Sequence, residues 1–582
     1  MKYIFKYDLF LVIYLFPFII TAQSYELKGI FSSPLSIPLT LSGNFGELRS
    51  NHFHGGLDIK TESIEGKVVL AVADGYISRI KISPSGYGNV LYINHTNNYM
   101  TVYGHLKCFR KDIEEYTLIE QYENLSFPVD LEPEESRFPV RKGDTIAFSG
   151  NSGSSGGPHL HFEIRDINSE ITYNPLLFGF EIKDNVPPLI EAIEIVPCNS
   201  LSLMNGLPVK KIIPVKKTGA NYHLNINDPI DVSGDIGFGI LCFDRLNGES
   251  NKCGIYSIEL LIDGNRTYYF LNDQLVIDDS RYLLSHIDYK EKLLHNRAFQ
   301  KSYIDPNNLL TSYHDVKGRG ILQFYDDSLH NITYQVKDTY GNISILNFNV
   351  QSHKPEKKNY LVKKTECARI IPFQSAYTFE SDSITITFPE KALYDTLYLQ
   401  IDKSKKLIKS YSPVYNIHNR YTPLHKAITL CIKADSIPLH LIDKLLIASV
   451  NKNKNNNKIS LRSVGGIYSN GMVTANTREF GNYTIVADTI PPVIKPVNIS
   501  KGKKMSSLTG IKFTISDNLS GIDSYNGLID DNWVLFRYDE KRKLLYYEFD
   551  KTRMVKNVDH KLFLKVSDKR NNEATFETNF YW

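Results

Sequence analysis

Asn-His-Phe-His-Gly-Gly-Leu-Asp, at residues 51–58, is the stretch that decides how this 582-residue chain is organised. Its downstream counterpart is Gly-Gly-Pro-His-Leu-His-Phe-Glu at residues 156–163, and Tyr-Gly-His-Leu lies between them at residues 103–106. The three motifs gather histidines and an aspartate, which are residue types that bind transition metals. These residues are His54, Asp58, His105, His159 and His161.

The spacing within the motifs predicts a metal site carried by β structure. Side chains two residues apart on a strand point to the same face, so His159 and His161 project together. His54 and Asp58 either share a strand face or flank a tight turn, since the adjacent glycines between them disfavour a helix. Two imidazoles, a carboxylate and an open position are typical of catalytic zinc, whereas structural sites usually have four ligands and favour cysteine.

The motifs resemble those of the lysostaphin-type (M23) zinc metallopeptidases, a family that cuts peptidoglycan peptides. The family pattern is His-x-x-x-Asp, then a histidine in a Tyr-x-His-Leu context, then His-x-His, and all three occur here in that order. The strand and glycine loop before the last motif, at residues 143–153, are also similar. The resemblance covers roughly residues 30–180 and implies a β-rich M23-type peptidase domain.

The resemblance also implies a role for each motif residue. His54, Asp58 and His161 would bind Zn²⁺, the expected cofactor, and His105 and His159 would be catalytic. Zinc can lower the pKa of a bound water to about 7. One catalytic histidine would take the water's proton, and the other would stabilise the oxyanion and protonate the leaving amine. The motif itself does not assign these two roles, nor does it distinguish His159 from His161.

Two residues beside the motifs have open interpretations. His52 shares strand parity with His54 and is therefore an alternative metal ligand. Glu163 shares a strand face with His161, so it either orients that imidazole or is a solvated strand residue. The sequence favours the solvated interpretation of Glu163 and disfavours His52 as a ligand, because one turn cannot easily offer two rings to one metal.

The segment between the motifs is predicted to be mostly β structure. Residues 90–94 and 99–105 read as a hairpin around a polar turn. Strand parity places His105 at the end of its strand, on the face that carries Tyr103, where its side chain can enter a cleft at the sheet's edge. Residues 111–124 are charged with a few apolar positions, which indicates a surface helix.

Composition favours β structure and gives no argument for a polyanion-binding function. The chain contains 37 Tyr and 30 Phe and is rich in β-branched residues, and these residue types are enriched in strands. Its 67 basic and 64 acidic residues give a formal charge of +3, so no nucleic-acid partner is expected.

The N-terminus has the features of an export signal. Residues 1–22 combine early lysines, an apolar run at residues 9–20 and small residues at the predicted cleavage site. The apolar run is short for a membrane span, and no later segment is apolar enough to form one. The mature protein is therefore expected to be exported to the periplasm or the cell surface, with no transmembrane span after signal removal.

Export would permit disulfide bonds among the six cysteines. Cys242 and Cys253 form the most plausible pair because they flank a polar turn. Buried free thiols are an equally good interpretation, and the sequence does not fix the other pairings.

A repeat in the second half of the chain indicates a duplicated module. Asp-x-x-Pro-Pro occurs at residues 184–188 and 488–492, and two further markers follow each copy in the same order. The strand-rich pattern is similar to immunoglobulin-like β-sandwiches of bacterial surface proteins. The last marker contains Asp338 in one copy and Asp568 in the other, which alone offer too few ligands for a calcium site.

The predicted domain order follows from these features. A signal peptide at residues 1–22 precedes the M23-type peptidase domain at 25–183. Immunoglobulin-like β modules occupy residues 184–351 and 488–582. A β domain of unknown type separates them at residues 352–487. The predicted fold class is thus mainly β, with a β-rich peptidase domain followed by β-sandwich modules.

The predicted function is zinc-dependent endopeptidase activity on peptidoglycan stems or cross-links during cell-wall remodelling. The substrate follows from the family resemblance, and the β modules could bind a protein partner or position the enzyme on the wall. Two alternatives are a wall-binding regulator that does not cut, and an adhesin or scaffold in which the β modules carry the function.

Overall fold

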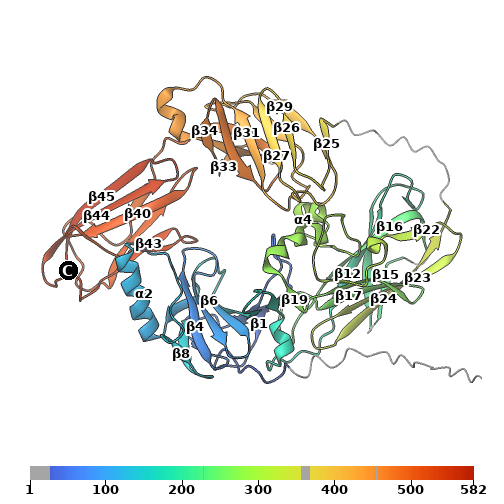
Figure 1. Ribbon diagram of the computed structural model, residues 1–582, viewed down its shortest axis with the longest axis horizontal. Coiled ribbons are helices and arrows are strands. Elements are labelled where there is room, and N and C mark those ends of the chain that lie inside the picture. The colour runs from blue at the N-terminus through green and yellow to red at the C-terminus, as the bar shows by residue number, and fades with distance from the viewer. Residues whose placement is uncertain (1–26, 220, 227–228, 355–366, 454–455) are drawn as a thin grey trace, which may run out of the picture.

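The computed structural model describes residues 27–219, 221–226, 229–354, 367–453 and 456–582. The predicted signal peptide at residues 1–22 lies outside these ranges. In the described part of the chain, no helix is both long and apolar enough to cross a membrane. Nearly all regular structure is β-strand, which confirms the predicted mainly β fold (Figure 1).

The N-terminal domain is built on an antiparallel sheet with the central order β1-β2-β10-β6-β5-β4-β7. Its core contains the fully buried rings of Tyr103 and Phe162, and burying a large apolar side chain stabilises a fold by about 1.5–3 kcal/mol. The predicted hairpin and surface helix are confirmed as β5, β6 and α2. The elements are β1 (Leu41–Gly43), β2 (Leu57–Lys60), β3 (Val68–Leu70), β4 (Gly75–Ile82), β5 (Asn89–His95), β6 (Tyr99–Phe109), α2 (Lys111–Glu123), β7 (Val129–Leu131), β8 (Pro139–Val140), β9 (Thr145–Ser149), β10 (His159–Asp166), β11 (Thr172–Tyr173) and η1 (Pro175–Phe178).

The first β module follows and packs around a separate apolar core. Its long strand β16 pairs with both β12 and β24, which joins the strands into one folded sheet. The elements are β12 (Leu189–Pro197), β13 (Leu203–Met204), β14 (Lys211–Thr218), β15 (Asn221–Leu224), β16 (Ile230–Phe243), β17 (Ser257–Ile262), β18 (Asn265–Leu271), β19 (Gln274–Leu275), η2 (Ile277–Tyr282), α3 (Leu283–His286), α4 (Tyr289–His295), β20 (Gln300–Lys301), β21 (Tyr313–His314), η3 (Gly318–Gly320), β22 (Leu322–Phe324), β23 (Leu329–Lys337) and β24 (Ile343–Ser352).

The middle β domain packs sheets β26-β27-β31-β35-β34 and β29-β30-β36-β32-β33 around a third core. The elements are β25 (Arg369–Ile371), β26 (Tyr377–Glu380), β27 (Ile384–Phe388), β28 (Leu397–Leu399), β29 (Ile401–Ser404), β30 (Val414–Ile417), β31 (Ile428–Lys433), η4 (Leu439–Lys444), β32 (Leu445–Lys452), β33 (Ile459–Gly465), β34 (Ile467–Ser469), β35 (Met472–Thr477) and β36 (Gly481–Ala487).

The C-terminal module repeats part of the first module's topology. Strands β17, β23 and β24 are neighbours in that order, and so are β40, β44 and β45, while β12 pairs with β16 as β37 pairs with β39. This agrees with duplication, although the predicted domain boundaries stay a prediction. The elements are β37 (Val493–Pro496), β38 (Lys503–Lys504), β39 (Gly510–Ser516), β40 (Ile522–Ile529), β41 (Asn532–Trp533), β42 (Arg537–Asp539), β43 (Leu544–Glu548), β44 (Asp559–Asp568) and β45 (Glu573–Tyr581).

All six cysteines are free thiols, so the disulfide considered for Cys242 and Cys253 does not form. The physical reason is that the two side chains belong to different cores. Cys242 packs in the core of the first β module, whereas Cys253 packs in the core of the N-terminal domain.

The two β modules both contact the N-terminal domain, and Figure 1 shows the chain closing into a ring. On one side, Asn44 forms two hydrogen bonds with the backbone of Gly254, at 2.7 and 2.9 Å. On the other side, the C-terminal module packs against α2, where the guanidinium of Arg553 lies 3.6 Å from the ring centre of Tyr122. The N-terminal domain is therefore held between the first and the last module.

Candidate metal centre and active site

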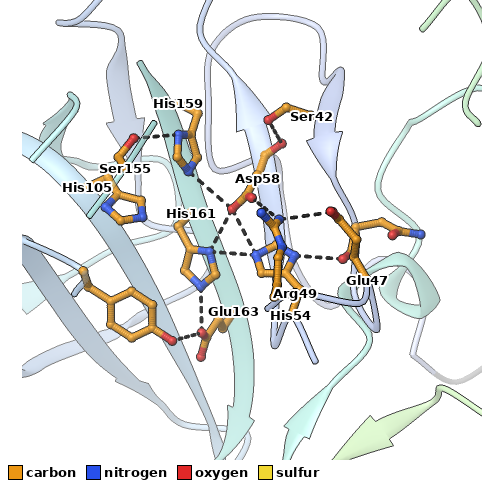
Figure 2. A network of polar contacts seen from close by, with 12 residues as sticks. Ser42, Glu47, Arg49, His54, Asp58, His105, Ser155, His159, His161 and Glu163 are labelled. Carbon is orange, nitrogen blue, oxygen red and sulfur yellow. Dashed lines mark hydrogen bonds and ion pairs between the residues drawn. The ribbon is translucent and has the colours of Figure 1, made fainter. Parts of the chain in front are cut away.

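Asp58 and His161 lie directly opposite each other on neighbouring strands β2 and β10 (Figure 2). His54 precedes β2 and is separated from it by the two glycines, so the flanking-turn alternative is correct and the shared-strand alternative is wrong. Gly56 is required there, because a Cβ at this position would lie 2.4 Å from the carbonyl oxygen of Phe162. The turn thus packs against β10 and brings His54 to the same place as Asp58 and His161.

Three donor atoms from these residues form a compact triangle. His54 Nε2 lies 3.0 Å from Asp58 Oδ1 and 3.1 Å from His161 Nδ1, and His161 Nδ1 lies 2.9 Å from Asp58 Oδ1. All three side chains are buried. These contacts group His161, rather than His159, with His54 and Asp58.

The triangle fits a zinc ion. Ligands of a tetrahedral zinc at about 2.0–2.1 Å lie about 3.3 Å from one another, close to the separations present here. The remaining polar atom of each residue is already held. His54 Nδ1 lies 2.8 Å from the Asn44 carbonyl oxygen, Arg49 Nη2 donates to Asp58 Oδ2 at 2.6 Å, and His161 Nε2 lies 2.7 Å from Glu163 Oε1. Such outer contacts fix the tautomer and orientation of metal ligands.

Electrostatics also suit a cation at this point. Burial lowers the pKa of His54, and the nearby Asp58 charge only partly opposes this. Burial alone would raise the pKa of Asp58, but the charge of His54 and hydrogen bonds from His159 and His161 hold it well below its usual value. Against burial, hydrogen bonds with Asp58 and Glu163 raise the pKa of His161 to about 9. An ionised carboxylate and two imidazoles therefore share a space in which a metal can replace protons.

Glu163 holds His161 in place, and its interpretation as a solvated strand residue is wrong. Only 1% of Glu163 is exposed, because β10 is covered by neighbouring chain on this face. It accepts a hydrogen bond from Tyr87 at 2.5 Å and pairs with Arg165 at 2.6 Å. The Tyr87 ring stacks on His161 with ring centres 4.9 Å apart. Strand parity could have identified Glu163, whereas no motif marks Tyr87.

His159 lies beside the triangle, on its outer side. Its Nε2 is 3.3 Å from Asp58 Oδ1, and its Nδ1 is 2.9 Å from the Gly157 carbonyl oxygen and 3.1 Å from Ser155 Oγ. The Gly157 contact fixes Nδ1 as a donor, so Nε2 is the nitrogen at which the ring gains or loses a proton, and the proton it gains is shared with Asp58. His159 is therefore oriented to exchange a proton at Nε2.

His105 faces His159, with ring centres 4.8 Å apart. The predicted position at a strand end, on the face of Tyr103, is wrong, because β6 continues to Phe109 and a bulge interrupts its alternation. His105 itself has a left-handed backbone with φ of 60°, which turns its side chain away from the buried Tyr103 and into the site.

Two further contacts define the state of His105. Its Nδ1 lies 2.9 Å from the carbonyl oxygen of Ser152, in the glycine loop. Burial, with smaller effects from the charges of His161 and His159, lowers the pKa of His105 to about 3. The ring is therefore neutral near pH 7.

His52 does not reach the centre. Its side chain is exposed and its Nδ1 lies 2.8 Å from Asn51 Oδ1. Arg49, by contrast, binds Asp58 directly although no sequence signal marks it. Gly43 makes this approach possible, because a Cβ there would lie 2.5 Å from Arg49 Nη2.

The β-sheet framework and the His/Asp triangle define the class of site, which is a metallopeptidase-type centre. The model of peptidase family M23 matches residues 52–127, and the model of the Zu5-like domain matches residues 368–488. The N-terminal domain of this chain thus matches the model of peptidase family M23, the family whose motifs it resembles. The β domain of unknown type is similar to Zu5-like domains.

Curated relatives are similar to this chain over about a quarter of its length. The DD-carboxypeptidase/endopeptidase Mpg of Neisseria meningitidis is 32% identical over 143 residues, which is 24% of this chain and 27% of that protein. The murein hydrolase activator NlpD of Salmonella typhimurium is 28% identical over 135 residues, 23% of this chain and 28% of that protein. The chain thus spans about a quarter of the length of the curated relatives that it matches.

The solved catalytic domain of the antimicrobial peptidase lysostaphin from Staphylococcus simulans is 23% identical. The match covers 23% of this chain and 87% of that domain, with a TM-score of 0.18.

Proposed function

We propose that this chain is a zinc-dependent endopeptidase that hydrolyses peptide bonds in peptidoglycan stems or cross-links. The observation that carries the proposal is the triangle of His54, Asp58 and His161, whose donor atoms lie 2.9–3.1 Å apart. Because the other polar atom of each side chain is already engaged, these three donor atoms are left to face one point. Zinc held by the three residues would supply Lewis acidity and would lower the pKa of a bound water to about 7.

The chain's own groups account for the proton transfers. His159 Nε2, at 3.3 Å from Asp58 Oδ1, is placed to take a proton from a nucleophilic water. The neutral ring of His105 is then available to donate a hydrogen bond to the developing oxyanion, provided its proton is on the outward nitrogen. If the outward nitrogen of His105 carries the proton, Nδ1 has none. Nδ1 lies 2.9 Å from the Ser152 carbonyl oxygen, however, and this contact favours a proton on Nδ1. His105 therefore has to change tautomer or lose that contact during turnover.

The substrate and cellular location are part of the same proposal. Similarity to Mpg, named a DD-carboxypeptidase/endopeptidase, supports peptidoglycan peptides as substrate. Action on that polymer agrees with export to the periplasm or cell surface. A second candidate, a regulator that binds the wall without cutting it, is favoured by the similarity to NlpD, named a murein hydrolase activator.

Release of soluble muropeptides by the purified chain distinguishes these functions. We expect release that a zinc chelator stops and added Zn²⁺ restores, and that His159→Ala reduces by about 10²-fold or more. His52→Ala is the matched control, because its exposed ring lies outside the centre, and it should retain full release. No release by the zinc-loaded chain from any peptidoglycan tested would favour the regulator.

A further inference from the structure

Three aspartates meet where the N-terminal domain joins the first β module. Asp184 lies in the linker before β12, Asp244 follows β16, and Asp338 lies between β23 and β24. One carboxylate oxygen of each lies within 4.8 Å of the others, and no histidine or cysteine of the described residues belongs to the group. No ion pair within the described ranges involves any of the three. Three carboxyl groups therefore gather without an ion-pair partner among the described residues.

A tight turn holds Asp338 in place. Asp338 Oδ1 accepts hydrogen bonds from the backbone N–H groups of Tyr340 and Asn342, both at 2.9 Å. The side chain of Asn342 donates to Asp338 Oδ2 at 2.6 Å and to the Asp184 carbonyl oxygen at 3.3 Å. The turn thus fixes Asp338 beside the linker that carries Asp184, independently of any ion.

Two carboxylate oxygens of the group are buried without a hydrogen-bond partner in the described structure, Asp244 Oδ1 and Asp184 Oδ2. Asp244 is only 2% exposed. A buried carboxylate oxygen without a partner is costly, because nothing replaces the water that it loses. Asp244 therefore has an unmet need for a positive charge or a donor.

The electrostatic cost is concentrated on the same residues. Burial, reinforced by the charges of Asp184 and Asp338, raises the pKa of Asp244 to about 8. Burial and the neighbouring Asp338 raise the pKa of Asp184 to about 6. A bound cation would reverse this cost, since it favours the ionised form of each carboxylate.

The C-terminal module contains a second copy of the arrangement, formed by Asp488, Asp517 and Asp568. Asp568 Oδ1 accepts from the N–H groups of Arg570 and Asn572 at 2.7 and 2.9 Å. The side chain of Asn572 donates to Asp568 Oδ2 and to the Asp488 carbonyl oxygen, as Asn342 does in the first copy. The turn and the three aspartates are thus duplicated in detail.

The copies differ in what compensates the negative charge. Asp488 Oδ2 accepts from the Ser520 N–H at 2.9 Å, whereas the corresponding oxygen of Asp184 has no partner in the described structure. Asp517 Oδ1 lacks a partner, as Asp244 Oδ1 does, but Asp517 Oδ2 accepts from the N–H groups of Leu519 and Gly521 at 2.9 and 2.8 Å. Arg570 occupies the position that Tyr340 occupies in the first copy. Burial lowers the pKa of Arg570, and the charges of Asp488 and Asp568 partly offset this effect, so a guanidinium lies near the second cluster. Neither cluster forms an ion pair among the described residues; the second differs in having the Arg570 guanidinium nearby, and that group donates to the Gly466 carbonyl oxygen at 2.8 Å.

We propose that Asp184, Asp244 and Asp338 form a calcium site, whereas the second cluster, whose carboxylate oxygens receive more backbone N–H groups, does not. An oxygen-only set of carboxylates suits a hard cation, and Ca²⁺ accepts their irregular geometry together with water. Bound calcium ties the linker to the segment from Asp244 to Cys253, whose backbones pair at 2.9 and 3.0 Å. The next residue, Gly254, binds Asn44, so the ion stabilises the junction between the first β module and the N-terminal domain.

Calcium titration of the full-length chain tests the site. After metal removal, we expect Ca²⁺ to bind with a Kd of about 0.1–1 mM, the range of extracellular calcium modules, and to raise the unfolding temperature. Asp244→Asn should weaken binding at least about tenfold, while the calcium-free variant is at least as stable as the calcium-free wild type, because the substitution removes buried charge repulsion. Asp517→Asn in the second copy is the matched control and should leave calcium binding unchanged.

Tyr340→Arg is an independent variant that keeps all three aspartates. It places the residue of the second copy in the first, and it should suppress calcium binding by supplying a guanidinium. The proposal is overturned if the wild-type chain shows neither binding heat nor a thermal shift up to about 10 mM Ca²⁺. Equal calcium binding by wild type and Asp244→Asn would also overturn it.

Discussion

The His/Asp triangle and the aspartate cluster of the first module are both buried sets of potential metal ligands, but they differ in what surrounds them. At the triangle, the outer atoms of the ligands are engaged by Asn44, Arg49 and Glu163. At the cluster, Asp244 Oδ1 and Asp184 Oδ2 have no partner in the described structure. The ligands of the first site are thus oriented by the chain itself, whereas the second site leaves carboxylate oxygens that a cation would have to engage.

Loss of a triangle ligand should have the largest effect. We expect Asp58→Ala to lower muropeptide release by about 10³-fold or more, equivalent to about 4 kcal/mol in the transition state, because it removes a ligand and leaves Arg49 paired with Glu47 alone. Bound zinc, measured by metal analysis after dialysis, should fall with it. Retention of full zinc and activity would show that the triangle is not the metal centre.

Loosening an outer contact should have the next largest effect. Glu163→Gln keeps the shape of the side chain but removes the charge that orients His161, so zinc affinity should fall about 10- to 100-fold. Competition with a chromogenic chelator measures this. Glu170→Gln is the matched control, because Glu170 also pairs with Arg165, at 3.3 Å, but is exposed. Equal effects of the two variants would mean that orientation by the chain does not distinguish the triangle from the cluster.

Selective chelation separates the two sites in one sample. A calcium-selective chelator should lower the unfolding temperature. At a temperature where the chain is still folded, zinc-dependent release should be retained. The loss corresponds to about 1.4 kcal/mol if calcium was present at ten times its Kd. A zinc-selective chelator should stop release and leave the calcium-dependent stabilisation intact. Loss of both properties with either chelator would contradict two independent sites.

Local spacing identified the candidate ligands, whereas the choice of His161 over His159 followed from the family resemblance. His159 and His161 share a strand face as their separation requires, and the turn that brings His54 to Asp58 is one of the two alternatives that the sequence left open. Parity failed at His105, because one residue with positive φ inverts the alternation of β6. A pattern of period two cannot reveal such a bulge.

Contacts that depend on tertiary pairing could not be predicted. Arg49 reaches Asp58 through a loop without a recognisable motif, and Asp244 joins Asp184 and Asp338 only because β16 ends where the linker begins. The repeat did identify Asp184 and Asp338, because both lie in the short sequences that recur in the same order in the two copies. The sequence did not identify Asp244 as a third ligand, so it gave no argument for calcium.

The smallest expected effect tests whether the triangle depends on the C-terminal module. Lys541 of that module donates to Asn151 Oδ1 and to the Ser155 carbonyl oxygen, both at 2.9 Å, and Ser155 Oγ lies 3.1 Å from His159 Nδ1. Lys541→Ala should lower release by less than about tenfold, since a partly exposed charged hydrogen bond contributes about 1 kcal/mol. Zinc content should not change, because the contacts that orient the ligands lie within the N-terminal domain. A severalfold rise in release would instead show that the module restrains His159, and a loss of zinc would show that orientation of the triangle extends beyond its own domain.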